Sequence, residues 1–195
     1  GNPPWEKLMI MRNRWWCLRF PGLLGLGVKE RDTTVKELEN LHPDLLTQLE
    51  EEETEYEIVR QVISSGPYPK IGTGHIDLYK AFAWRNWQVL RSGGRLGLVL
   101  PRAALAAAGT TEWRKTIFES GSFDNVCFLV NTGGWVFDQI HQQFSVSLVV
   151  ISKGSGRNVE FCGPFHSLTD FNTGRDELTV VPIEEFSQWS DTLTF

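Results

Sequence analysis

The segment from residue 77 to 152 constrains the fold most, because a stretch with helical spacing is followed there by short aliphatic runs. An apolar stripe predicts a helix that Asp77 can cap and that ends before Gly93 and Gly94. The stripe consists of Leu78, Phe82, Val89 and Leu90. The run RLGLVLP at 95–101 is short and almost entirely apolar. Such a run is typical of a strand buried on both faces, as in a parallel sheet.

A second helix and two further strands are predicted after that run. Thr110 or Thr111 can cap a helix that extends through Phe118. The β-branched segments at 125–130 and 144–152 predict strands joined by a loop. These elements form half of a doubly wound α/β sheet that closes on a hairpin. The tail predicts a short strand, a connector and a helix or turn.

Residues 33–63 predict two amphipathic helices, because leucine, valine and isoleucine recur among charged residues at helical spacing. The break between them is expected at His42-Pro43, since proline lacks the amide that a continuing helix needs. A loop dense in glycine and proline follows at 64–75.

The sequence Asn-Pro-Pro-Trp at 2–5 is a costly way to build an ordinary turn. Each proline fixes its own φ, removes a backbone donor and restricts the residue before it. The result is a stiff loop whose carbonyls and whose Asn2 side chain can accept hydrogen bonds in fixed directions. A plain turn is the alternative interpretation.

The net charge of −5 argues mildly against a large nucleic-acid footprint. Much of the acidity lies at 50–57, which is typical of the solvated face of a helix. A basic, aromatic cluster at 12–19 contains Arg12, Arg14 and Arg19. These arginines can contact phosphates, or they can pack against the neighbouring tryptophans.

The cysteines are odd in number and widely spaced, which predicts reduced, mostly buried thiols of a cytoplasmic protein. They are Cys17, Cys127 and Cys162. The scattered cysteines and histidines form no metal-ligand pattern. No apolar run approaches the roughly 18 to 20 residues of a membrane span, so no membrane partner is expected.

Three stretches, in this order, resemble the N6-adenine DNA methyltransferases of the type IIG restriction–modification family and related phage-defence methylases. NPPW at 2–5 resembles their catalytic motif, and GTGHIDLYKAF with LRSGGRLGLVLP resembles the segment that follows it. NTGGWVFDQIHQQFSVSLVVIS resembles a later motif, in which an aromatic residue at a loop precedes a hydrophobic hairpin strand. The resemblance implies the C-terminal half of a Rossmann-like class I methyltransferase sheet.

The resemblance also implies that Asn2, Pro3, Pro4 and Trp5 are catalytic, with S-adenosylmethionine as the methyl donor. Asn2 Oδ1 and the Pro3 carbonyl are expected to accept hydrogen bonds from the amine of an adenine turned out of its duplex. Acceptors that strengthen as positive charge grows on nitrogen stabilise the transition state. Trp5 is expected to stack on that base.

Phe137 is by the same resemblance the edge or the opposite face of the base site, with Trp135 and Phe144 as nearby substitutes. A plain place in the hairpin core is the alternative for Phe137, and Phe144 is expected to lie in the core. Arg102 directly follows the strand at 95–101. We expect Arg102, like Arg12 and Arg14, to be a candidate DNA contact, and a surface ion pair is its alternative.

The resemblance divides the chain into a catalytic half at 1–153, with a helical insertion at 33–65, and a connector at 154–195. The donor-binding loop of the family precedes the catalytic motif, so the main S-adenosylmethionine site is expected upstream of Gly1. The chain alone is therefore expected to bind the donor poorly and to be inactive. Expected partners are double-stranded DNA, an N-terminal donor-binding half and a C-terminal target-recognition domain.

NPPW also resembles the NPPY motif of protein-glutamine methyltransferases and of some RNA methyltransferases. A methyltransferase for cytosine N4, RNA or a protein amide therefore stays open as an alternative. A DNA-binding module without catalysis is a further alternative.

Overall fold

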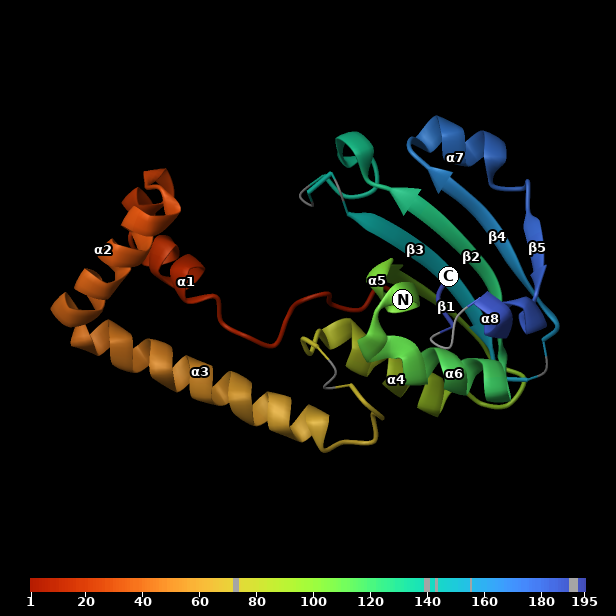
Figure 1. Ribbon diagram of the computed structural model, residues 1–195, viewed down its shortest axis with the longest axis horizontal. Coiled ribbons are helices and arrows are strands. Elements are labelled where there is room, and N and C mark those ends of the chain that lie inside the picture. The colour runs from red at the N-terminus through yellow and green to blue at the C-terminus, as the bar shows by residue number, and fades with distance from the viewer. Residues whose placement is uncertain (72–73, 139–140, 143, 155, 190–192) are drawn as a thin grey trace. The chain divides into compact units, whose positions relative to one another are not determined.

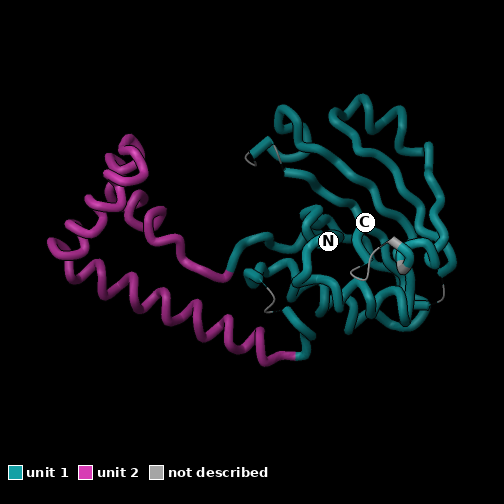
Figure 2. The backbone as a smooth tube through the Cα atoms, viewed as in Figure 1, with its two compact units in different colours: residues 1–7, 67–195 teal, residues 8–66 magenta. Residues whose placement is uncertain are grey.

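The computed structural model describes residues 1–71, 74–138, 141–142, 144–154, 156–189 and 193–195 (Figure 1). The chain divides into two compact units (Figure 2). Unit 1 comprises residues 1–7 and 67–195, and unit 2 comprises residues 8–66. The NPPW loop at 2–5 therefore belongs to the unit formed by the distant C-terminal part of the chain.

Unit 1 is built on a mixed sheet of five strands in the order β1-β3-β2-β4-β5. The strands are β1 (Arg95–Pro101), β2 (Ser122–Val130), β3 (Ser145–Ser152), β4 (Asn158–Phe165) and β5 (Thr179–Pro182). β3 is antiparallel to both β1 and β2, β4 is parallel to β2, and β5 is antiparallel to β4. The α/β fold and the hairpin of the sequence analysis are confirmed.

The expectation that β1 pairs as in a parallel sheet is wrong for its strand neighbour β3. β1 and β2 run in the same direction, but β3 lies between them and is antiparallel to each. An apolar run records how deeply a strand is buried and not the direction of its neighbour. Leu98 and Leu100 are buried, while Val99 between them is half-buried and points to the other face.

Helices pack on the sheet of unit 1 (Figure 1). They are α4 (Leu78–Val89), α5 (Ala103–Ala106), α6 (Thr111–Ser120), α7 (Leu168–Gly174) and α8 (Ile183–Trp189), with short 3-10 turns η2 (Ala108–Thr110) and η3 (Thr132–Gly134). The largest core cluster joins α4 and α6 to the sheet through Trp84, Trp87, Trp113 and Phe123. Burial of these large aromatic rings dominates the packing energy of this face.

The apolar stripe predicted for α4 is not the face that the helix buries. Phe82 is 44% exposed and Val89 is 63% exposed, whereas Trp84 and Trp87 are almost fully buried. The two indoles bury more apolar area than the aliphatic stripe would, and they turn the helix accordingly. Asp77 occupies the N-cap position without a capping side-chain hydrogen bond.

The second predicted cap also differs from expectation. Thr110 is the N-cap residue of α6, but its side chain makes no capping hydrogen bond. The Thr110 hydroxyl instead donates to the carbonyl of Ala107 at 2.9 Å. A hydroxyl that bonds the preceding turn is a common alternative to a cap.

Unit 2 is helical. Its elements are α1 (Arg12–Arg19), η1 (Pro21–Gly25), α2 (Val28–Leu41) and α3 (Pro43–Ser64). The predicted break at His42-Pro43 is confirmed, with Pro43 at the first position of α3, where its missing amide costs nothing. α2 begins at Val28, before the predicted start at residue 33. The sequence analysis did not predict α1. Trp16 and Leu49 are fully buried in the core of this unit.

The tail at 154–195 contributes to the sheet of unit 1. β4 and β5 lie in it, and Phe186 of α8 is buried in the main core.

The three cysteines are free and buried, as expected. Within the described ranges, no helix is long and apolar enough to cross a membrane. No group of three or more metal-ligating side chains occurs among those same residues.

Candidate functional site

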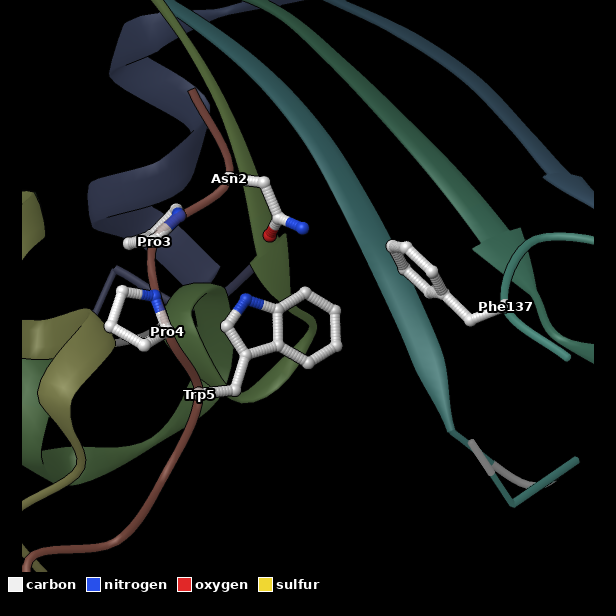
Figure 3. Close-up of a pocket in the computed structure, with 5 residues that line it drawn as sticks. All are labelled: Asn2, Pro3, Pro4, Trp5 and Phe137. Atoms are coloured by element: carbon white, nitrogen blue, oxygen red, sulfur yellow. The ribbon is translucent and has the colours of Figure 1, made fainter. Parts of the chain in front are cut away.

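A pocket of about 450 Å³ lies where the NPPW loop meets the loop between β2 and β3. Its described lining is Asn2, Pro3, Pro4, Trp5 and Phe137. Figure 3 shows the Asn2 amide and the Trp5 indole on the same side of the backbone, toward Phe137. The fold thus brings together the five residues to which the sequence analysis gave catalytic and base-binding roles.

The amino end of the loop is anchored on the outer edge of β1. The Gly1 nitrogen donates to the Gly97 carbonyl at 2.6 Å, and the Val99 amide donates to the Gly1 carbonyl at 2.9 Å. These two bonds flank Leu98 in the pattern of parallel strand pairing. Gly1 thus lies beside the centre of β1 and runs parallel to it, so the chain continues from Asn2 toward the carboxyl end of β1, where α/β proteins place their ligands.

The far end of the loop is anchored on the start of α4. Lys7 and Asp77 form an antiparallel bridge, and the Leu78 amide donates to the Glu6 carbonyl at 2.9 Å. Lys80 is buried, and its ammonium lies 3.4 Å from the Asp77 carboxylate. It also donates to the His75 carbonyl. The loop is held at both ends while its centre faces the pocket.

Trp5 is half-buried, and its Nε1 donates to the Val99 carbonyl over 3.4 Å. The ring centroids of Trp5 and Phe137 lie 5.8 Å apart, with an angle of 83° between the planes. The two rings therefore stand nearly perpendicular to each other, as in an edge-to-face pair. The Asn2 side chain is exposed, and within the described residues it has no hydrogen-bond partner.

Phe137 comes from the loop between β2 and β3, and Asn131 holds that loop. Asn131 is fully buried at the end of β2. Its Oδ1 accepts from the amides of Val136 and Phe137 at 3.0 Å, and its Nδ2 donates to the Phe137 carbonyl at 2.8 Å. Sequence reasoning missed Asn131. The available signal was an asparagine directly after a β-branched run and before Gly133 and Gly134.

The other aromatic residues near this loop do not line the described pocket wall. Phe144 is 51% exposed, so its expected place in the core is wrong. The cause is its position just before β3, where the loop has not yet reached the sheet. Trp135 is half-buried, and its Nε1 donates to the Val130 carbonyl at 2.7 Å. Its ring contacts Phe171 of α7.

Arg102 is exposed at the carboxyl end of β1, and its guanidinium carbon lies 5.6 Å from the centroid of the Phe128 ring. No ion pair to Arg102 occurs among the residues that the structure describes. Its side chain is accessible to a phosphate. The surface ion pair that the sequence left open is therefore not formed within the described part of the chain.

The other arginines of interest lie in unit 2. Arg12 pairs with both carboxylate oxygens of Glu53, at 2.7 and 2.6 Å. The pair lowers the pKa of the Glu53 carboxyl and raises the pKa of Arg12. Arg19 stacks on the Trp15 ring at 3.2 Å, while Arg14 is exposed. Packing and pairing within unit 2 thus occupy Arg12 and Arg19.

The described lining of the pocket is uncharged. Of the described residues that line it, none carries a carboxylate or a basic group. A donor with ribose hydroxyls and a charged amino-acid end needs such groups, because buried polar atoms must be paired. The polar groups of these lining residues are the Asn2 amide, the Trp5 indole N–H and the backbone.

No protein-family model matches the sequence, and no curated protein matches it. Solved structures do match its fold. A modification subunit assigned to a type I restriction enzyme of Vibrio vulnificus YJ016 is 12% identical, with a TM-score of 0.51, over 68% of this chain and 32% of its own. The matched two thirds of this chain thus share the fold of about a third of that modification subunit.

Two other matched structures have lower TM-scores. The type IIG restriction endonuclease BpuSI is 14% identical, with a TM-score of 0.47, over 69% of this chain and 18% of its own. A Listeria monocytogenes protein assigned to the class I S-adenosylmethionine-dependent methyltransferases is 18% identical, with a TM-score of 0.44, over 57% of this chain and 34% of its own. The chain spans about a third of the length of the Vibrio subunit.

Proposed function

We propose that the chain is the base-binding and catalytic half of an N6-adenine DNA methyltransferase of a restriction–modification or defence protein. One observation carries the proposal: the Asn2 amide, the face of Trp5 and the ring of Phe137 border one pocket. The fold shared with a modification subunit supports it. The donor belongs to the proposal as S-adenosylmethionine, bound by parts of the protein that this chain does not span.

In this proposal, Asn2 and Pro3 orient the acceptor nitrogen. The lone pair of the adenine amine is delocalised into its ring, so the nitrogen is a weak nucleophile. Asn2 Oδ1 and the Pro3 carbonyl accept the two N6 hydrogens and favour a pyramidal nitrogen whose lone pair points at the donor. The prolines fix these acceptors before the base arrives, which reduces the entropy lost in the transition state.

Trp5 and Phe137 divide the binding of the base. A base parallel to the indole meets Phe137 nearly at a right angle, because the two rings stand 83° apart. Phe137 is therefore an edge contact and not the second face of a sandwich. Stacking on one aromatic face contributes about 1–3 kcal/mol, which offsets much of the few kcal/mol that turning the base out of the duplex costs.

The test uses the full-length protein that contains this chain. DNA from cells that express the gene is sequenced for methylated bases, with wild type and Asn2→Ala in parallel. We expect N6-methyladenine at a defined sequence in the wild type and its loss, by about 100-fold or more in rate, in Asn2→Ala. Asn125→Ala is a matched control on β2, outside the pocket, and should keep the mark.

Each other outcome identifies a different protein. Methylation of cytosine alone overturns the adenine assignment. It would leave in place the proposal that Asn2 Oδ1 and the Pro3 carbonyl accept hydrogen bonds from the amine that is methylated. Methylation of RNA or of a protein amide, with none in DNA, overturns the substrate class. DNA binding that Asn2→Ala leaves unchanged, with no methylation in either protein, shows a binding module.

A further inference from the structure

We propose that Asn131 is a positioning residue that fixes Phe137 against the base pocket. The inference rests on the proposed function, because it assigns to Asn131 the task of holding the edge contact of the base. Asn131 does not line the described pocket wall itself. It acts through the peptide groups on both sides of the Phe137 side chain.

The contacts define the mechanism. Asn131 Oδ1 accepts from the Val136 and Phe137 amides, each at 3.0 Å, and Nδ2 donates to the Phe137 carbonyl at 2.8 Å. One side chain thus bonds both the amide and the carbonyl of Phe137. Because these two groups bracket its Cα atom, they set the direction in which the phenyl ring leaves the backbone.

The loop needs such a fixed point. It leaves β2 at Val130 and turns back through Gly133 and Gly134, whose φ angles of 68° and 76° suit glycine. The Asn131 amide donates to the Phe144 carbonyl at 3.1 Å, so its backbone also closes the base of the loop. Asn131 therefore links the rigid end of the sheet directly to the residue that borders the pocket.

Burial makes this link strong. The Asn131 side chain is fully buried, so water does not compete for its hydrogen bonds. A buried amide satisfied at both its oxygen and its nitrogen has one favoured orientation, whereas a free loop samples many. The 5.8 Å distance between the Trp5 and Phe137 rings depends on that orientation.

The test measures position and activity separately in the full-length protein. Amide hydrogen exchange reports on Val136 and Phe137, and methylation of DNA gives kcat and KM. We expect Asn131→Ala to speed exchange at both amides about tenfold or more. Asn131→Asp keeps the acceptor but opposes its charge to the Phe137 carbonyl, so its exchange should lie between wild type and Asn131→Ala.

A double-mutant cycle shows whether Asn131 acts through Phe137. Phe137→Ala and Asn131→Ala should each reduce methylation, by about 10-fold to 100-fold. The double variant should be no worse than Phe137→Ala within about threefold. Val159→Ala is the control for general destabilisation, because Val159 is buried near the amino end of β4. It should leave amide exchange at residues 136 and 137 unchanged.

Three results decide the inference. Unchanged exchange in Asn131→Ala overturns it, and so does a double variant whose loss is the product of the two single losses. Equal effects of Val159→Ala would reduce Asn131 to a structural residue. If the wild type methylates no DNA, the proposed function is wrong. The amide-exchange experiment then still decides whether Asn131 holds Phe137 in place.

Discussion

The indole nitrogen of Trp5 lies 3.4 Å from the carbonyl oxygen of Val99, so the aromatic wall of the pocket is tied to strand β1. The second wall, Phe137, is tied through Asn131 to the end of β2. Because β1 and β2 run in the same direction, both anchors lie at the carboxyl edge of the sheet. The pocket is thus held on two rigid strands although its lining comes from loops.

Replacing Trp5 should separate stacking from anchoring. Trp5→Ala removes the aromatic face and should weaken binding of the flipped base by about 1–3 kcal/mol, which is about 5-fold to 150-fold. Trp5→Phe loses the hydrogen bond to Val99 but keeps an aromatic face. Because stacking needs only that face, Trp5→Phe should retain most of the affinity for the base. Fluorescence of 2-aminopurine at the target position measures the binding. Equal losses in both variants would contradict a stacking role.

Lys80 should stabilise the anchor at the start of α4. Its ammonium is buried beside the Asp77 carboxylate, so Lys80→Met leaves that carboxylate partly buried without its cation. We expect a loss of about 3 kcal/mol in the free energy of unfolding, measured in urea. Adding Asp77→Asn should restore part of the loss. Arg85→Met, on the exposed side of α4, is the control and should change stability little.

The Arg12–Glu53 pair should make the stability of unit 2 depend on pH. Arginine lowers the pKa of Glu53, so the folded chain loses this contribution as pH falls from the unfolded pKa of about 4.3 through the lower folded value. At pH 7, Glu53→Gln should cost about 0.2–1 kcal/mol, because both side chains are partly exposed. Below the folded pKa of Glu53, where its carboxyl is protonated, the variant and wild type should converge. Glu51→Gln, an exposed control position also on α3, should have nearly the same stability as wild type under both conditions.

Arg102 should contribute to DNA affinity through a phosphate. Its side chain is exposed at the carboxyl edge of β1. Arg102→Ala should weaken binding similarly for all sequences and reduce the slope of log K against log salt by about 0.9. Fluorescence anisotropy at several salt concentrations measures that slope. An equal change in Arg85→Ala would show a general charge effect and no specific contact.

Local steric rules account for what could be predicted from the sequence. Proline stereochemistry gave the stiff loop at 2–5 and the break at His42-Pro43, since both depend on neighbouring residues only. β-Branched runs gave β2 and β3 as a hairpin. The prediction of Phe137 came from a family resemblance, and its role in the base site stays a prediction.

Tertiary structure decided the rest, because pairing and burial depend on residues far apart in the chain. The apolar pattern of β1 did not reveal that β3 lies between β1 and β2. The buried face of α4 carries Trp84 and Trp87 and not the predicted aliphatic stripe. Which residues are stiff, apolar or able to accept a hydrogen bond follows from their chemistry alone and can be read from the sequence. Only the fold placed Trp5 and Phe137 5.8 Å apart, because that distance depends on the strands that carry both loops.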